Sequence, residues 1–291
     1  MSTTPDLFVG LVTHRNSAFN SSGEATRALE NLSLQLEGSG LQVETLISDR
    51  DDYTSESFPI SPDSLKSAAK AQSQLERDWR LFLLSRAGFT APIRFAKQAG
   101  THALYQLMLF KRFAATKGGG TSPAAKAYRR LINIDLSHRR ILEEGLMSGA
   151  SVIVVLEDDA SELNVQQVHV LADVIRMASN QGVDFINLSE SISLNDLGVT
   201  RILNRGKNIL SVHGSQVIAT DTPVTNTVCA NIYGSDFATL FASYLSEDRL
   251  TPVIPIDWRL NQVMLDYPDT RCWWVRPGLF LQRSMHATSR D

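Results

Sequence analysis

Cysteine is scarce in this sequence: Cys229 and Cys272 are the two present in 291 residues. They lack the paired spacing of a zinc site, and two cysteines cannot build the disulfide framework of a small secreted protein. We therefore expect a reduced protein of the cytoplasm.

Long apolar runs are lacking as well. No stretch approaches the roughly 20 apolar residues that a membrane-spanning helix needs. The opening Met1–Asp6 is polar and has neither the basic nor the apolar segment of a signal peptide. We expect no transmembrane segment, whereas peripheral contact with a membrane stays open because it needs no such run.

An excess of positive charge is absent. The chain has 28 Lys and Arg against 31 Asp and Glu, a net charge of -3. Nucleic-acid-binding proteins usually carry a strongly basic face, so we expect no nucleic-acid partner. Because 43% of the residues are hydrophobic, the chain can bury a sizeable core. We expect one domain over residues 1–291.

The first fifty residues alternate between strand and helix patterns. Leu7–Thr13 is a short apolar run and Leu41–Ile47 alternates, as strands do. Between them, Ser21 and Glu24 have the spacing of a capping box, and leucines follow at helical spacing up to Gly38. Strand, helix and strand in this order predict a parallel βαβ unit.

The α/β alternation continues along the rest of the chain. Residues 61–115 have helical composition and two prolines, which indicates a helical insertion, and residues 124–149 have a long helical pattern. The later elements expected are strands at Val152–Leu156, Val183–Leu188 and Arg271–Val275, a helix from Asn164 to near Gly182, a strand pair Leu210–Thr220 and Val224–Tyr233 with its turn at 221–223, and helices beginning at Ser235 and after Pro255. The predicted fold is one Rossmann-like α/β domain with a mostly parallel central sheet.

Three consecutive acids, Glu157, Asp158 and Asp159, directly follow the apolar strand pattern Val152–Leu156. In open α/β sheets, ligands bind beyond the carboxyl ends of the strands. Three carboxylates on one turn repel each other unless a cation or hydrogen-bond donors compensate. Oxygen ligands suit Mg²⁺ or Mn²⁺, which would neutralise a departing diphosphate. The alternative is a solvated acidic turn stabilised by the dipole of the next helix.

Leu136-Ser137-His138, a helix and then Ile153–Ala160 (IVVLEDDA) resemble the core of the family-25 glycosyltransferases, the lipopolysaccharide-type sugar transferases. In that family a Ser-His pair begins a helix that leads to a strand ending in Leu-Glu-Asp-Asp. The resemblance extends over roughly residues 132–282, with weaker likenesses at Val183–Leu188, Thr227–Tyr233 and Pro255–Trp258. Asn133-Ile134 differ from the Gly-Cys that the family usually has before Ser-His.

The resemblance implies a domain of the GT-A type. Such a domain would transfer a sugar from a nucleotide-sugar donor, UDP-sugar by the resemblance, to a hydroxyl of a glycan or another acceptor, with Mn²⁺ or Mg²⁺ bound. By the same resemblance, Asp159 would bind the metal directly, and Glu157 or Asp158 would reach the ribose or a metal-bound water.

The resemblance also places Thr13, His14 and Arg15, at the end of the first predicted strand, beside the nucleotide. A guanidinium such as that of Arg15 suits the donor phosphates, and the alternative is a surface arginine in a polar loop. Asp49 follows the second predicted strand, where related domains often meet the base. A turn-forming aspartate is the alternative.

Three histidines compete for roles at such a site. GT-A domains commonly supply a histidine from a C-terminal tail, so we predict His286 as a further metal ligand; a disordered terminus is the alternative. His213 competes with it. His138 either contacts the reacting groups, caps or packs at a helix start, or supports the site from behind.

Asp257 is the predicted general base. If transfer inverts the sugar carbon, a carboxylate near the acceptor hydroxyl takes its proton. Asp257 follows Pro255 at the start of an apolar helix pattern, so an N-terminal cap is the alternative.

Two other functions remain open. A nucleotidyltransferase on a similar sheet should have a glycine-rich loop with Arg and Lys after the first strand, which Thr13–Ser17 lacks. A non-catalytic domain that binds a carbohydrate or a partner could keep the fold, although the intact acidic triplet argues against it.

Overall fold

The computed structural model describes residues 6–14, 17–49, 74, 77–78, 123–189, 204, 206–220, 228–246 and 255–284. The elements, in chain order, are β1 (Leu7–Thr13), α1 (Glu24–Gly38), β2 (Val43–Asp49), α4 (Pro123–Ser148), β3 (Val152–Glu157), α5 (Val165–Gln181), β4 (Phe185–Asn187), β5 (Lys207–Val212), β6 (Ser215–Thr220), β7 (Ala230–Gly234), α8 (Ser235–Ser246), α9 (Ile256–Asp266) and β8 (Cys272–Arg276). The predicted insertion over 61–115 lies outside the described residues, apart from Gln74, Arg77 and Asp78, which are helical.

One mixed sheet of eight strands, in the order β2-β1-β3-β7-β4-β8-β6-β5, forms the centre of the fold. The α/β class is therefore as predicted, but the mostly parallel sheet is wrong. Three strand pairs are parallel and four are antiparallel. The difference arises because β7 runs in the opposite direction between β3 and β4, and because the β5–β6 hairpin extends one edge.

The hairpin also corrects the predicted strand pair. Leu210–Thr220 is not one strand, because His213 and Gly214 have φ of 48° and 83° and form the turn between β5 and β6. Both residues of a two-residue hairpin turn of this kind need positive φ. The second predicted strand is represented by β7, which pairs with β3 and β4 instead of with β6.

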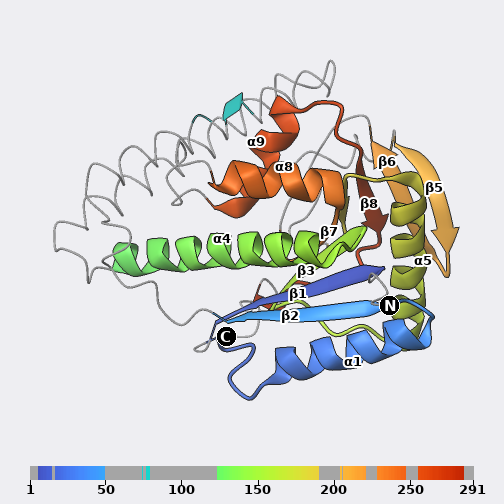
Figure 1. The fold of residues 1–291 in the computed structure, drawn as a ribbon, viewed down its shortest axis with the longest axis horizontal. Coiled ribbons are helices and arrows are strands. Elements are labelled where there is room, and N and C mark those ends of the chain that lie inside the picture. The colour runs from blue at the N-terminus through green and yellow to red at the C-terminus, as the bar shows by residue number, and fades with distance from the viewer. Residues whose placement is uncertain are drawn as a thin grey trace.

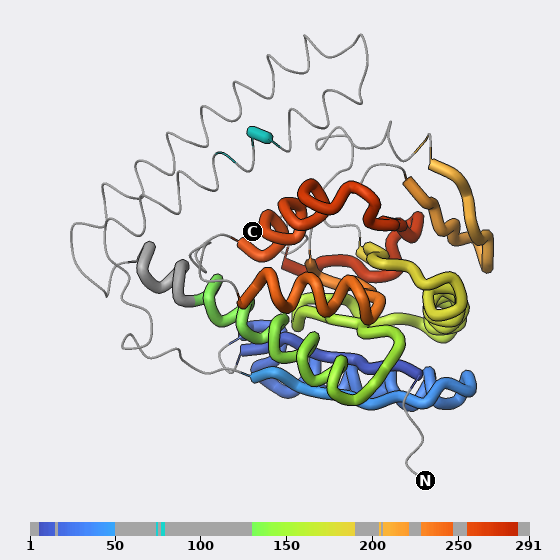
Figure 2. The backbone as a smooth tube through the Cα atoms, turned by 45° about the horizontal axis from the view of Figure 1, so that its top comes forward, coloured from blue at the N-terminus to red at the C-terminus, as the bar shows by residue number. Residues whose placement is uncertain are grey.

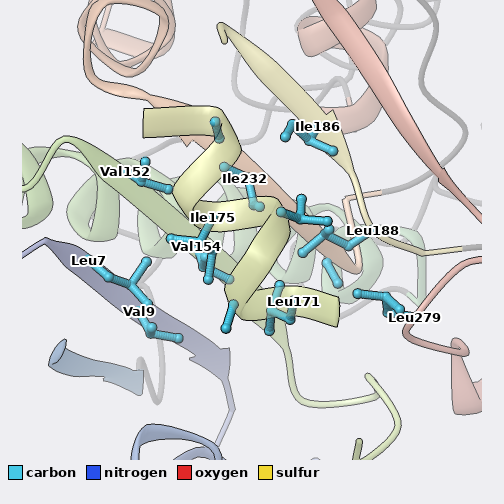
Figure 3. Close-up of a cluster of buried hydrophobic side chains, with 14 of the residues drawn as sticks. Leu7, Val9, Val152, Val154, Leu171, Ile175, Ile186, Leu188, Ile232 and Leu279 are labelled. Atoms are coloured by element: carbon cyan, nitrogen blue, oxygen red, sulfur yellow. The ribbon is translucent and has the colours of Figure 1, made fainter. Parts of the chain in front are cut away.

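The sheet lies between two layers of helices, as Figures 1 and 2 show. One face packs against α1 and α5, where Leu171 and Ile175 lie over Val154 and Ile232 (Figure 3). The other face packs against α4, α8 and α9. Because β1 and β3 are covered on both faces, their sequences are continuous apolar runs instead of alternating ones.

Helix starts follow the sequence in one case and depart from it in another. Asn164 accepts a hydrogen bond from the backbone N–H of Gln167, and the Gln167 side chain closes a capping box at the start of α5. The capping box expected from Ser21 and Glu24 is wrong. Gly23, with φ of 73°, is the N-cap of α1 and has no side-chain cap bond.

Neither cysteine forms a disulfide: Cys229 and Cys272 are both buried thiols. In the part of the chain that the structure describes, no helix is both long enough and apolar enough to cross a bilayer.

Close packing of α4 against the sheet depends on Gly10. A Cβ at this position of β1 would overlap the side chain of Ile141 in α4. We expect Gly10→Ala to lower the free energy of unfolding by about 1–3 kcal/mol, because overpacking displaces the helix. Urea unfolding would measure the change.

Gly38→Ala is the control for this substitution. Gly38 lies at the end of α1 with no atom near its would-be Cβ. Its substitution should leave stability unchanged or raise it by up to about 1 kcal/mol. Equal effects at the two positions would contradict the packing argument.

Candidate functional site

Three parallel strands end together at one edge of the sheet. Thr13 is in register with Asp49 across β1 and β2, and Val12 is in register with Glu157 across β1 and β3. The end of the first predicted strand, the end of the second and the acidic turn therefore lie side by side. This edge is the carboxyl end of the strands, where α/β sheets bind their ligands.

The acids of the turn point to opposite faces of the sheet. Glu157 faces α4, where its Oε1 lies 3.3 Å from Nε2 of His138. The Oδ2 of Asp158 accepts a hydrogen bond of 2.9 Å from the Thr13 hydroxyl. This divergence follows from the strand geometry, because successive side chains of an extended chain alternate between the two faces.

Asp159 contacts neither His138 nor Thr13 and lies in a different environment from the other two acids. Its Oδ2 accepts a hydrogen bond from the Ser284 hydroxyl. The residue is 7% exposed, and its Oδ1 has no hydrogen-bond partner within the described residues. A buried carboxylate oxygen without a donor is costly, and a cation would satisfy it. Asp159 therefore fits a metal ligand.

The acidic turn is not a preformed cage. Among the residues that the structure describes, no group of three or more His, Cys, Asp or Glu side chains is arranged to hold a metal ion. Since the three carboxylates diverge, Asp159 is the one that is placed to coordinate a cation directly, and other ligands would have to come from outside this turn. Mg²⁺ commonly binds in this way, through one or two carboxylates and substrate phosphates.

A segment near the C-terminus crosses this edge of the sheet. The backbone N–H of Leu279 donates to the carbonyl of Leu188, at the end of β4, over 2.8 Å. Further along, Ser161 N–H donates to the carbonyl of Leu281, and Leu281 N–H donates to the Ser161 hydroxyl, both over 2.9 Å. The segment thus joins β4 to the chain that follows the acidic turn.

Arg283 continues this segment and brings a positive charge to the acids. Its backbone N–H donates to the carbonyl of Asp159 over 2.8 Å, and its Nη2 donates to the carbonyl of Asp158 over 2.6 Å. The guanidinium carbon lies 5.2 Å from the ring centre of Phe19, and Nη1 lies 3.8 Å from Glu24. Arg283 therefore links the loop after β1 to the acidic turn. No sequence pattern singles it out.

Asn20 organises the loop after β1, and sequence reasoning missed it too. Its Nδ2 donates to the Thr13 hydroxyl over 3.0 Å, and its Oδ1 accepts from Thr26 N–H over 3.3 Å. The carbonyl of His14 accepts from Ser17 N–H over 2.8 Å.

Arg15, predicted to meet the donor phosphates, lies outside the described residues. Asp49 is exposed at the end of edge strand β2.

A small pocket lies beside the acidic turn on the α1 face. It has a volume of about 90 Å³, and its walls include Leu29, Leu32, Ser161 and Phe280. That volume is smaller than a cavity that holds a benzene ring.

Cys229 directly precedes β7 and contacts the acidic turn. Its carbonyl accepts a hydrogen bond of 2.8 Å from the N–H of Glu157. Burial raises the pKa of the Cys229 thiol above its usual range. The charges of Asp159 and Glu157 raise it further, as does a hydrogen bond to the Asp159 side chain. The thiol is therefore neutral beside the acids.

His138 lies inside a helix and not at its start. Because α4 begins at Pro123, the capping role considered for His138 is wrong, as is a helix that begins at Ser137-His138. The imidazole is fully buried, and its contact is with Glu157. It therefore supports the acidic turn from behind.

Two further predicted residues differ in how the structure places them. His213 lies in the β5–β6 hairpin, and β6 is four strands from β3 in the sheet, about 19 Å at the usual strand spacing. It does not join the acidic turn. Asp257 lies half-buried in the first turn of α9, whose N-cap is Pro255, so the capping role for Asp257 is wrong. His286 lies outside the described residues.

A scan against protein-family models gives no match for this chain, and a search of curated proteins finds none.

Proposed function

We propose that the protein is a metal-dependent glycosyltransferase of the GT-A type, which transfers a sugar from a UDP-sugar to a hydroxyl of a glycan or another acceptor. One observation carries this proposal: Asp159, at the carboxyl end of central strand β3, is nearly buried and keeps an unpaired oxygen. A carboxylate in this state is suited to a cation that neutralises a leaving diphosphate. The family-25 resemblance of the surrounding residues supports the same reaction.

The donor would lie along the edge where β1, β2 and β3 end. In this proposal Asp159 binds Mn²⁺ or Mg²⁺, and Glu157 or Asp158 reaches the ribose or a metal-bound water. Thr13 and Asp49 lie at the same edge by register, which supports nucleotide contacts from Thr13, His14, Arg15 and Asp49.

His286 is proposed as a further metal ligand. Ser284 contacts Asp159, and His286 follows two residues later. Two residues of chain span at most about 7 Å, which supports the proposal that His286 reaches the acidic turn.

Asp257 is proposed as the base that takes the acceptor's proton during inverting transfer. It lies two residues before Arg259, which pairs with Asp135 on α4, one helical turn from His138. This chain of contacts supports a place for the start of α9 on the α4 side of the acidic turn. The donor would lie along the carboxyl ends of β1 and β3, within reach of Thr13, Glu157 and Asp158.

Nucleotide binding tests the proposal. In calorimetry with Mn²⁺, we expect uridine diphosphate to bind at least about ten times more tightly than the guanosine and cytidine forms. The expectation of uridine comes from the family resemblance alone. Without Mn²⁺ the binding should be lost, because the diphosphate and the acids repel each other.

Preference for guanosine diphosphate would refute the choice of nucleotide. Binding of none of the three would refute the donor site. Binding without turnover of any UDP-sugar would favour the non-catalytic alternative.

A further inference from the structure

Three charged or ionisable side chains are buried beneath the acidic turn, between the helices of the α4 face. Asp135 and His138 lie on α4 and are 3% and 0% exposed, and Arg259 lies on α9 and is 1% exposed. Asp and Arg side chains are almost never fully buried unless they are paired. Their placement therefore needs a reason beyond packing.

Two contacts, linked through helix α4, form a route from Arg259 to Glu157. His138 Nε2 lies 3.3 Å from Glu157 Oε1. Asp135, three residues earlier on the same helix, has its Oδ2 2.5 Å from Nη1 of Arg259. Residues three apart on a helix project from one face, so the two contacts are neighbours.

Arg259 fixes the far end of this route. Its Nη2 donates to the carbonyls of Tyr244 and Leu245, in the last turn of α8, over 3.3 Å each. One guanidinium thus joins α9, α8 and α4. The planar guanidinium of arginine, with its several N–H donors, is better suited than a lysine ammonium to join three helices.

Stability does not explain the arrangement. Replacing a buried ion pair by apolar residues of similar volume is often neutral or stabilising. Burial raises the pKa of Asp135 to about 6, although Arg259 opposes the shift. In addition, Nδ1 of His138, Oδ1 of Asp135 and Nε of Arg259 have no hydrogen-bond partner among the described residues. The fold therefore retains polar groups here at a cost.

We propose that His138, Asp135 and Arg259 are positioning residues that hold the Glu157 carboxylate in place for the donor. Because a carboxylate can only accept, His138 Nε2 donates to Glu157 and fixes its rotamer. Asp135 and Arg259 fix the position of α4 relative to α8 and α9. They thereby fix the position of His138 relative to the acidic turn. The link to the donor rests on the proposed function, whereas the positioning of Glu157 does not.

Substitutions at His138 test the first contact. His138→Gln can keep a donor near the position of Nε2, whereas His138→Leu cannot. With Mn²⁺, we expect uridine diphosphate to bind at least about tenfold more weakly to His138→Leu and within about threefold of wild type to His138→Gln. Equal affinity of His138→Leu and wild type would overturn the proposal.

The double variant Asp135→Leu, Arg259→Met tests the rest of the route without leaving a buried charge unpaired. We expect it to fold with an unchanged or higher melting temperature, and to bind uridine diphosphate about fivefold or more weakly. Asn261→Leu is the matched control. Asn261 is also buried in α9, and its Oδ1 has no hydrogen-bond partner among the described residues. It takes part in none of the contacts between Arg259 and Glu157 described above, so the affinity of Asn261→Leu should not change.

A crystal structure of the double variant provides a readout that does not depend on nucleotide. The Glu157 carboxylate should move by more than about 1 Å or become disordered, and the same carboxylate in Asn261→Leu should stay in place. If wild type binds no uridine diphosphate, the proposed function fails, and the position of Glu157 still decides this inference. An unmoved Glu157 in the double variant would overturn it.

Discussion

Replacing Asp159 with alanine should abolish nucleotide-sugar binding and reproduce the effect of a chelator. Of the three acids in the turn, Asp159 is the one with a buried oxygen that has no hydrogen-bond partner among the described residues, so it is the best placed to bind a cation. Even residues that only orient metal ligands cost 10–100-fold when lost. We therefore expect uridine diphosphate affinity with Mn²⁺ to fall by at least about 100-fold, measured by calorimetry.

The same substitution should leave the fold intact. The carboxylate of Asp159 lies one residue from Asp158 and near Glu157, and removing one of three like charges relieves repulsion. The melting temperature without metal should therefore be unchanged or higher. Loss of binding with a preserved melting temperature would distinguish a ligand role from a structural one.

Asp173→Ala is the matched control. Asp173 is an aspartate on α5 that pairs with Arg176 at the surface. It should bind uridine diphosphate like wild type. The metal assignment would be contradicted if Asp159→Ala bound uridine diphosphate as tightly as wild type, or if wild type kept its affinity in the presence of chelator.

Replacing Asp257 with asparagine should reduce sugar transfer by about 10² or more while folding and donor binding stay near normal. The expected loss is the usual scale for a general base. A carboxylate beside an oxocarbenium-like centre also stabilises positive charge, and asparagine removes both effects. Because Pro255 is the N-cap of α9, Asp257→Asn removes no cap and keeps the side-chain volume.

Transfer would be measured as release of uridine diphosphate from UDP-sugars in the presence of a panel of glycan acceptors, next to calorimetry of donor binding. Asp236→Asn is the control, because Asp236 holds the equivalent place in the first turn of α8. That variant should lose neither binding nor transfer. Reduced donor affinity in Asp257→Asn, or unaltered turnover, would show that Asp257 is not the base.

The local elements of this fold could be predicted because their signals lie within a few residues. The apolar run of β1 specifies a strand buried on both faces, and Asn164 with Gln167 specifies the start of α5. Where one local signal competes with another, prediction failed. Gly23 caps α1 in place of Ser21, because a glycine adopts the positive φ that this turn requires.

The candidate site was predicted in outline from the same kind of signal. An acidic triplet after a buried strand places carboxylates at the carboxyl edge of the sheet, and the parallel β1–β3 register brings Thr13 beside it. Arg283 and Asn20 could not be predicted. Arg283 donates to backbone carbonyls and lies near Phe19 and Glu24, and Asn20 contacts one hydroxyl and one backbone N–H. Such contacts leave no pattern in the sequence.

By itself, the sequence determined the α/β class, the two-sided burial of β1 and β3, and an acidic turn where β3 ends. Only the tertiary structure decided the order of the strands, the reversed direction of β7 and the separate partners of the three acids. The physical reason is distance along the chain. Thr13 and Asp158 are 145 residues apart, and Asp159 and Ser284 are 125 apart. Contacts of this kind depend on how whole layers pack, and no local periodicity encodes them.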